Sequence, residues 1–269
     1  MPAWFHNLRR EVTGQAHQLA ERGLLLSGVP RPQALLVLGH MRSGSTLLLH
    51  LLMTHPQIAG VGERNAVYRR RADLSTLALV SRRARGPARR PLRYVADQVN
   101  HNHLTPQLAL LRDARVRVLF LLRRPEPTLA SLLEMSRRFY DDSWTLERAA
   151  DYYVTRLKFL QAAGAALGGA PSAATLTYEG LTTQPHAALA RLGSFLGLDS
   201  PLSARYATHG FTGQRGDPGP RIGAGEVLPP APPGRPLPRD ARPVAQALAA
   251  YEACRKTLAA RALVGGPDA

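Results

Sequence analysis

Five short segments along the chain have the length of one strand, and those at residues 35–38 and 117–122 are strongly apolar. The run at residues 117–122 reads RVLFLL and is apolar after its first residue, which is typical of a parallel strand buried on both faces. We therefore predict five strands, at residues 35–38, 57–62, 93–99, 117–122 and 173–177.

The longer stretches between these runs carry apolar residues at helical spacing. Trp4, Leu8 and Val12 recur every four residues near the N-terminus, and the pair His55-Pro56 is a stop signal for the helix before it. Residues 101–111 lead into a further helical turn. The main predicted helices are residues 3–26, 45–54, 126–139, 145–167, 183–196 and 241–262.

Alternating strands and helices predict an α/β fold, with a P-loop-like parallel sheet and helices on both of its faces. We expect a single domain over residues 1–269. It comprises an N-terminal helix in 1–30, an α/β core in 31–200, a segment rich in Pro and Gly in 201–239, and a C-terminal helix in 240–269. Ligands of such sheets bind at the carboxyl ends of the strands.

Composition limits the location of the protein more than its function. Cys254 is the only cysteine, so an internal disulfide or a cysteine-based zinc site is excluded. No stretch is long enough to span a bilayer, and residues 1–12 lack the apolar core of a signal peptide. We expect a cytoplasmic protein without stable membrane insertion.

The net charge of +16 has two readings that stay open. It favours an anionic partner such as a nucleotide, nucleic acid or acidic sugar. It also reflects a general preference for arginine, because only Lys158 and Lys256 among the 35 basic residues are lysines. The arginine-rich stretch at residues 64–90 is accordingly either a wall for an acidic acceptor or a solvated face.

The segment GHMRSGST, at residues 39–46, lies between a predicted strand and a predicted helix. Its spacing is that of the phosphate-binding loop G-x-x-x-x-G-K-[ST], with Ser45 in the place of the lysine and Arg42 as the nearby cation. Backbone N–H groups in such a turn converge on an anion at the helix N-terminus. The strand at 117–122 ends in Arg123 and Arg124 rather than in the aspartate that holds Mg²⁺ in NTPases, so we expect no metal.

Two segments resemble PAPS-dependent sulfotransferases of the bacterial or carbohydrate type, where PAPS is 3′-phosphoadenosine 5′-phosphosulfate. RSGSTLLLHLLMTHPQIAGVGE, at residues 42–63, resembles their 5′-phosphosulfate loop. VLFLLRRPEPTLASLL, at residues 118–133, resembles their 3′-phosphate motif, with Arg123, Pro125 and Ser131 at the matching positions. Two weaker blocks follow in the same order: Tyr178-Glu179, and the late glycine loop at residues 213–217.

The resemblance implies a three-layer sandwich that binds PAPS without metal. It places the nucleotide on Arg42, Ser43, Gly44, Ser45, Thr46, Leu47, Arg123, Ser131, Tyr178, Arg215 and Gly216. Leu47 stands where relatives often carry an aromatic residue, and Phe211-Thr212 replaces a basic pair before the late glycine loop. Arg215 and Arg221 are candidates to replace that pair.

Two residues are candidates for the base that takes the proton of the acceptor, with Arg42 stabilising the charge on the leaving oxygen. Glu63 follows the second predicted strand, and His103 follows the third, in NHNHL. Histidine titrates near neutral pH, whereas a glutamate base requires burial. Glu63 paired with an arginine, and His101 and His103 as polar loop residues, are the structural alternatives. We prefer Glu63, with His103 assisting.

The predicted function is transfer of a sulfuryl group from PAPS to a hydroxyl or amine of a small acceptor, which releases 3′-phosphoadenosine 5′-phosphate. Carbohydrates, lipids and secondary metabolites all remain open as acceptors. The alternatives are a P-loop kinase or NTPase, a catalytically degenerate nucleotide-binding protein, and a nucleic-acid-binding protein. Aromatic residues make up only 6% of the chain, so we expect no nucleic-acid partner.

Overall fold

The computed structural model describes residues 31–86, 91–139, 142–213, 217, 219–230, 236–238 and 240–263. The helix predicted at residues 3–26 lies outside the described residues, and so do Arg215 and Gly216. No helix within the described ranges has the length and apolar character needed to cross a bilayer.

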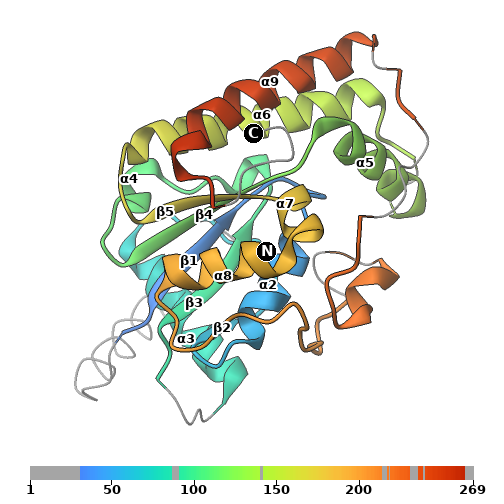
Figure 1. Ribbon diagram of the computed structural model, residues 1–269. Coiled ribbons are helices and arrows are strands. Elements are labelled where there is room, and N and C mark those ends of the chain that lie inside the picture. The colour runs from blue at the N-terminus through green and yellow to red at the C-terminus, as the bar shows by residue number, and fades with distance from the viewer. Residues whose placement is uncertain are drawn as a thin grey trace, which may run out of the picture.

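Five strands form one parallel sheet in the order β2-β3-β1-β4-β5 (Figure 1). They are β1 (Gln33–Leu38), β2 (Ile58–Gly60), β3 (Tyr94–Val99), β4 (Val116–Leu122) and β5 (Ala173–Thr177). The central strand β1 pairs with β3 on one side and β4 on the other. This arrangement opens a crevice at the carboxyl ends of the strands, where α/β sheets bind their ligands.

Helices cover both faces of the sheet, as the sequence predicts. Alternation along β1 directs Leu36 and Leu38 to one face, and Leu35 and Val37 to the other. The first face packs against α3 (Arg71–Arg85), α5 (Pro125–Phe139), α6 (Leu146–Leu167) and α9 (Arg242–Leu258). The second packs against α2 (Ser45–Thr54), α7 (Tyr178–Thr183) and α8 (Pro185–Leu196). Each fully buried leucine in these layers contributes about 1.5–3 kcal/mol of hydrophobic stabilisation.

Short helices fill the remaining connections: η1 (Asn102–Leu104), α4 (Leu108–Leu111), η2 (Pro220–Ala224) and η3 (Ala259–Arg261). The helix predicted at 183–196 corresponds to α8, which begins two residues later, at Pro185. The preceding helix α7 was not predicted; the Thr177 hydroxyl caps it by accepting a hydrogen bond from the Gly180 N–H. β3 ends at Val99 as predicted, and His103 lies beyond it in η1.

The segment that follows α8 returns to pack on α2. The Thr54 hydroxyl accepts from the Ala207 N–H (2.9 Å), and the rings of His50 and Phe211 meet edge to face. A Cβ added at Gly62 lies 2.9 Å from the Phe211 ring, so glycine is required for this close approach. The described part of residues 201–239 is therefore held against the core beside the phosphate loop.

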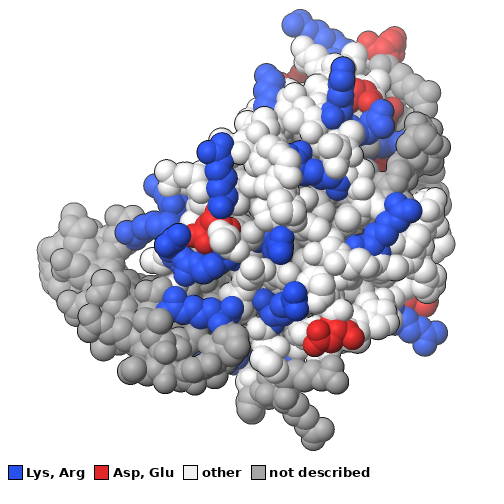
Figure 2. Space-filling view, turned by 60° about the vertical axis from the view of Figure 1, so that its left-hand side comes forward, with Lys and Arg blue, Asp and Glu red and all other residues white. Residues whose placement is uncertain are grey.

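The positive charge is distributed over the surface. Figure 2 shows Lys and Arg side chains separated by uncharged surface over the visible face, with a few acidic side chains among them. On this face the basic residues form no continuous stripe of the kind that follows a nucleic-acid backbone.

Candidate functional site

The turn between β1 and α2 has the geometry of an anion-binding loop. Arg42 (φ 66°) and Gly44 (φ 87°) both adopt left-handed backbone conformations. Among the described residues no side chain caps the N-terminus of α2, so its first N–H groups remain available to a ligand. A Cβ at Gly44 lies 2.5 Å from the Tyr178 ring, so the predicted Tyr178 packs directly on the loop.

A buried arginine braces this loop from below. Arg156, on α6, is fully buried and donates to the carbonyl oxygens of Gly39 (2.6 Å), His101 (3.2 Å) and Val99. Burial lowers its pKa to about 10, so the guanidinium still carries its charge at neutral pH. Arg156 therefore ties the ends of β1 and β3 together and adds a positive charge beneath the anion site.

Tyr152, one helical turn before Arg156, makes a parallel connection. Its hydroxyl accepts from the Met41 N–H and donates to the Asn100 carbonyl, both at 2.7 Å. Sequence reasoning identified neither residue. The available signal is that Arg156 occupies the same face of α6 as the buried Tyr153, Leu157 and Leu160.

The two predicted phosphate-binding arginines lie together. Arg42 donates through Nε to the Ser131 hydroxyl (2.8 Å) and pairs with the Asp217 carboxylate (2.9 Å). Arg123 donates to the Arg42 carbonyl (2.8 Å), and its guanidinium lies 4.2 Å from the centre of the Tyr178 ring. The structure thus brings together Arg42, Arg123, Ser131 and Tyr178, which are separated by up to 136 residues in the chain.

His40 positions Arg123 from beneath. Its Nδ1–H donates to the Met41 carbonyl (2.9 Å), and its Nε2 accepts from the Arg123 N–H (3.2 Å), so the neutral tautomer is fixed. Burial lowers the pKa of His40 to about 3, with the charges of Arg123 and Arg156 acting in the same direction. His40 is therefore a neutral structural residue rather than a proton donor.

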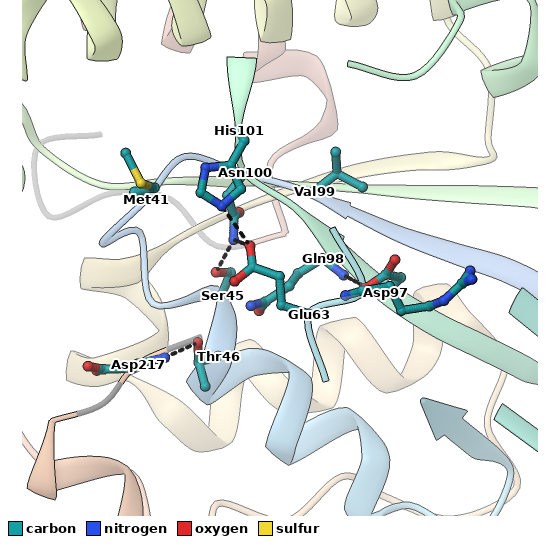
Figure 3. A network of polar contacts seen from close by, with 12 residues as sticks. Met41, Ser45, Thr46, Glu63, Asp97, Gln98, Val99, Asn100, His101 and Asp217 are labelled. Atoms are coloured by element: carbon teal, nitrogen blue, oxygen red, sulfur yellow. Dashed lines mark hydrogen bonds and ion pairs between the residues drawn. The ribbon is translucent and has the colours of Figure 1, made fainter. Parts of the chain in front are cut away.

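Asn100 connects the phosphate loop with the candidate base Glu63. Its Nδ2 donates to the Ser45 hydroxyl (3.0 Å) and to Glu63 Oε1 (3.1 Å), as Figure 3 shows. His101 Nε2 lies 3.5 Å from the same carboxylate oxygen. The hydrogen bond and the ion pair of Glu63 both involve Oε1, and within the described part of the chain no hydrogen bond to Oε2 occurs.

His103 does not join this group. Its side chain is exposed, and its ring packs against that of His101 with a centroid separation of 5.4 Å. His101 is the histidine that borders the cavity beside Glu63. The turn of η1 directs the second histidine of NHNHL toward solvent.

A second buried carboxylate fixes the turn that carries Glu63. Asp97 accepts from the Arg64 N–H (3.2 Å) and from the Tyr68 hydroxyl (2.5 Å). Burial raises the pKa of Asp97 to about 7, against the lowering effect of these hydrogen bonds. β3 therefore supplies Asp97, which anchors the turn, and the residue directly after β3, Asn100, is the partner of the Glu63 carboxylate.

These elements enclose a cavity of about 810 Å³. Most of the predicted site residues line it: Arg42, Gly44, Ser45, Thr46, Leu47, Glu63, Arg123, Ser131 and Tyr178. Ser43 lies behind the wall, fully buried. The lining also includes residues that sequence reasoning did not select, namely Met41, Arg64, Asn65, Gln98, Asn100, His101, Met135, Phe139, Tyr206, Asp217, Ile222, Glu226 and Leu228. Arg221, a candidate for the missing basic pair, lines it as well.

Neither a family model nor a curated protein matches the sequence. The chain is similar to a sulfotransferase from Alicyclobacillus acidocaldarius (16% identity, TM-score 0.48, 69% of this chain and 90% of that one). It is similar to the sulfotransferase domain of the curacin biosynthetic pathway (14% identity, TM-score 0.45, 64% of this chain and 76% of that one). It is also similar to the mouse sulfotransferase SULT7A1, whose structure is a complex with PAP (13% identity, TM-score 0.45, 64% of this chain and 61% of that one). All three solved structures are sulfotransferases.

Proposed function

We propose that this protein is a PAPS-dependent sulfotransferase that acts on a hydroxyl or amine of a small acceptor. The observation that carries the proposal is the juxtaposition across one cavity of two groups with different chemistry. Arg42, Arg123 and Ser131 form an anion site on one side of the phosphate loop. The Glu63 carboxylate lies on the other side and is linked to the loop through Asn100.

The donor set fits a nucleotide that carries phosphates at both ends of its ribose. The N–H groups at the start of α2, with Ser45 and Thr46, suit the 5′-phosphosulfate. Arg123 and Ser131 suit the 3′-phosphate, because Arg123 Nε is buried and without a hydrogen-bond partner among the described residues. PAPS, when bound, supplies an activated sulfuryl group, whose sulfur is bonded to an oxygen of the 5′-phosphate that leaves.

The residues on the acceptor side supply proton transfer. Glu63 Oε2 takes the proton of the acceptor while the acceptor oxygen or nitrogen forms its bond to sulfur. The bond from sulfur to the phosphate oxygen breaks, and Arg42 with the loop N–H groups stabilises the charge that develops there. His101, 3.5 Å from Glu63, takes the assisting role that the sequence suggested for His103.

Two measurements test this function. Calorimetric titration with 3′-phosphoadenosine 5′-phosphate (PAP) is expected to give one affinity in both EDTA and Mg²⁺, because the loop carries Ser45 in place of lysine and Arg123, rather than an aspartate, follows β4. Mass spectrometry after incubation with PAPS and an acceptor library is expected to show a sulfated product. Strict dependence of binding on Mg²⁺ supports a kinase-like enzyme instead, and binding without any product supports a degenerate one.

A further inference from the structure

The acceptor end of the cavity contains an amide that the fold leaves without a partner. Alternation along β3 directs Tyr94, Ala96 and Gln98 to the face that packs on α2. Gln98 is 3% exposed, and its Oε1 has no hydrogen-bond partner among the described residues. The residue lines the cavity, and Figure 3 shows its side chain alongside that of Glu63.

The neighbouring amide on the same face differs from it. Asn100 uses its Nδ2 for Ser45 and Glu63. Its Oδ1, like Gln98 Oε1, is buried without a hydrogen-bond partner among the described residues, but it lies against the phosphate loop, 3.2 Å from the position of a Cβ at Gly39. Asn100 is thus committed to holding the site together. Gln98 makes no side-chain hydrogen bond to any described residue, so its amide is available for another task.

Folding alone gives no reason for a glutamine at this position. A buried polar atom without a partner costs about 1–3 kcal/mol, and an apolar side chain of the same shape avoids that cost. The preceding residues on this face of β3, Tyr94 and Ala96, belong to the hydrophobic core. An unsatisfied amide beside a candidate catalytic carboxylate therefore indicates a ligand that completes its hydrogen bonds.

The surroundings indicate what that ligand offers. Arg64 and Asn65 line the cavity close to Glu63 in sequence, so this part of the wall is polar. The terminal amide of Gln98 rotates readily about its last torsion and presents either a donor or an acceptor. A hydroxyl group, which both donates and accepts, satisfies either orientation. An acceptor with an apolar group next to its reacting hydroxyl leaves the Gln98 amide unpaired. A site built to hydrogen-bond a ligand group rejects ligands that lack that group.

We propose that Gln98 binds a second hydroxyl of the acceptor, adjacent to the hydroxyl that faces Glu63, so that the acceptor is a vicinal diol or polyol rather than a phenol or a simple alcohol. The inference rests on the proposed function, because it takes Glu63 to mark the reacting end of the acceptor.

The first test needs no acceptor. Gln98→Met is expected to keep or raise the melting temperature of the ligand-free protein, because it removes an unsatisfied amide at nearly constant volume. Gln57→Met is the matched control. Gln57 is also buried, but its amide donates to the Asp199 carboxylate (2.8 Å) and accepts from the Asp199 N–H (3.0 Å). The control is expected to melt several degrees lower. An equal fall in both variants shows that the Gln98 amide is structural and overturns the inference.

The second test uses trans-1,2-cyclohexanediol and cyclohexanol as probes, titrated by NMR into the PAP complex. The wild type is expected to bind the diol about ten-fold more tightly than cyclohexanol, because one additional hydrogen bond contributes about that much to affinity. Gln98→Met is expected to lose this preference, and Gln57→Met to keep it. No preference in the wild type, or no binding of either probe, overturns the inference. PAP affinity in the same samples separates this result from failure of the proposed function, which predicts PAP binding in every case.

Discussion

Asp97 links the stability of the protein to pH in a direction opposite to that of most carboxylates. Burial raises its pKa from 3.8 to about 7, so the folded protein keeps a proton that the unfolded chain releases above pH 4. The free energy of unfolding therefore falls as the pH rises from about 4 to about 7. One pKa unit corresponds to about 1.4 kcal/mol, so the three units amount to a loss of about 4 kcal/mol.

Asp97→Asn is the variant that isolates this effect, because an amide keeps the shape of the carboxyl and does not titrate. Urea unfolding at pH 5, 6, 7 and 8 is expected to show the variant gaining on the wild type by about 1.4 kcal/mol per unit up to pH 7, and little beyond. Comparing the two proteins at each pH removes the contribution of the other titrating groups.

Asp113→Asn is the matched control. Hydrogen bonds and charge from Arg115 and Arg71 outweigh burial and hold the pKa of Asp113 at about 2. The stability that Asp113 contributes is complete above about pH 4 and is lost as the pH falls through 2. Its variant is therefore expected to differ from the wild type by a constant amount between pH 5 and 8. A constant difference for Asp97→Asn over the same range refutes the reasoning.

Three predictions concern the reaction. Glu63→Gln is expected to lower kcat by about 10²–10⁴ with unchanged PAP affinity, and His101→Asn by less, while His103→Asn stays near wild type; a larger loss for His103→Asn restores that residue as the base. Arg123→Ala is expected to weaken PAP binding by about 1.5–3 kcal/mol and to affect ADP, which lacks the 3′-phosphate, much less; calorimetry showing equal losses contradicts its assignment. Asn100→Leu is expected to reduce kcat far more than it weakens PAP binding, whereas Asn102→Leu, which removes a bond to the Tyr152 carbonyl instead, leaves kcat near wild type; equal kinetic effects show that both asparagines act through stability alone.

The sequence predicted the sheet well because its central strands, β1 and β4, are short apolar runs. β5 matches its prediction at both ends, and β4 differs by one residue. The helix α7 was missed because it depends on a single side-chain cap from Thr177, and a Thr-Tyr-Glu-Gly segment carries no apolar period over so short a length. A single local hydrogen bond of this kind can start a short helix, and such a helix leaves no periodic pattern of apolar residues in the sequence.

The anion side of the site was more predictable than the acceptor side. Arg42, Arg123 and Ser131 belong to motifs that are continuous in sequence, so their proximity followed from the positions of strand ends. Glu63 and Asn100 are 37 residues apart, and an asparagine after a strand usually indicates a turn. The choice between His101 and His103 depended on where β3 ends and on the turn of η1, which residue type alone does not determine.

The ion pair between Arg42 and Asp217 means that the anion site already holds a carboxylate before any ligand arrives. An incoming anion competes with Asp217 for the guanidinium, so binding is an exchange of one negative group for another. A monovalent ion such as chloride gains little from this exchange, whereas a dianionic phosphate that also meets the N–H groups of α2 gains much more. The protein thus carries an internal competitor that favours multiply charged anions over weakly charged solutes at this loop.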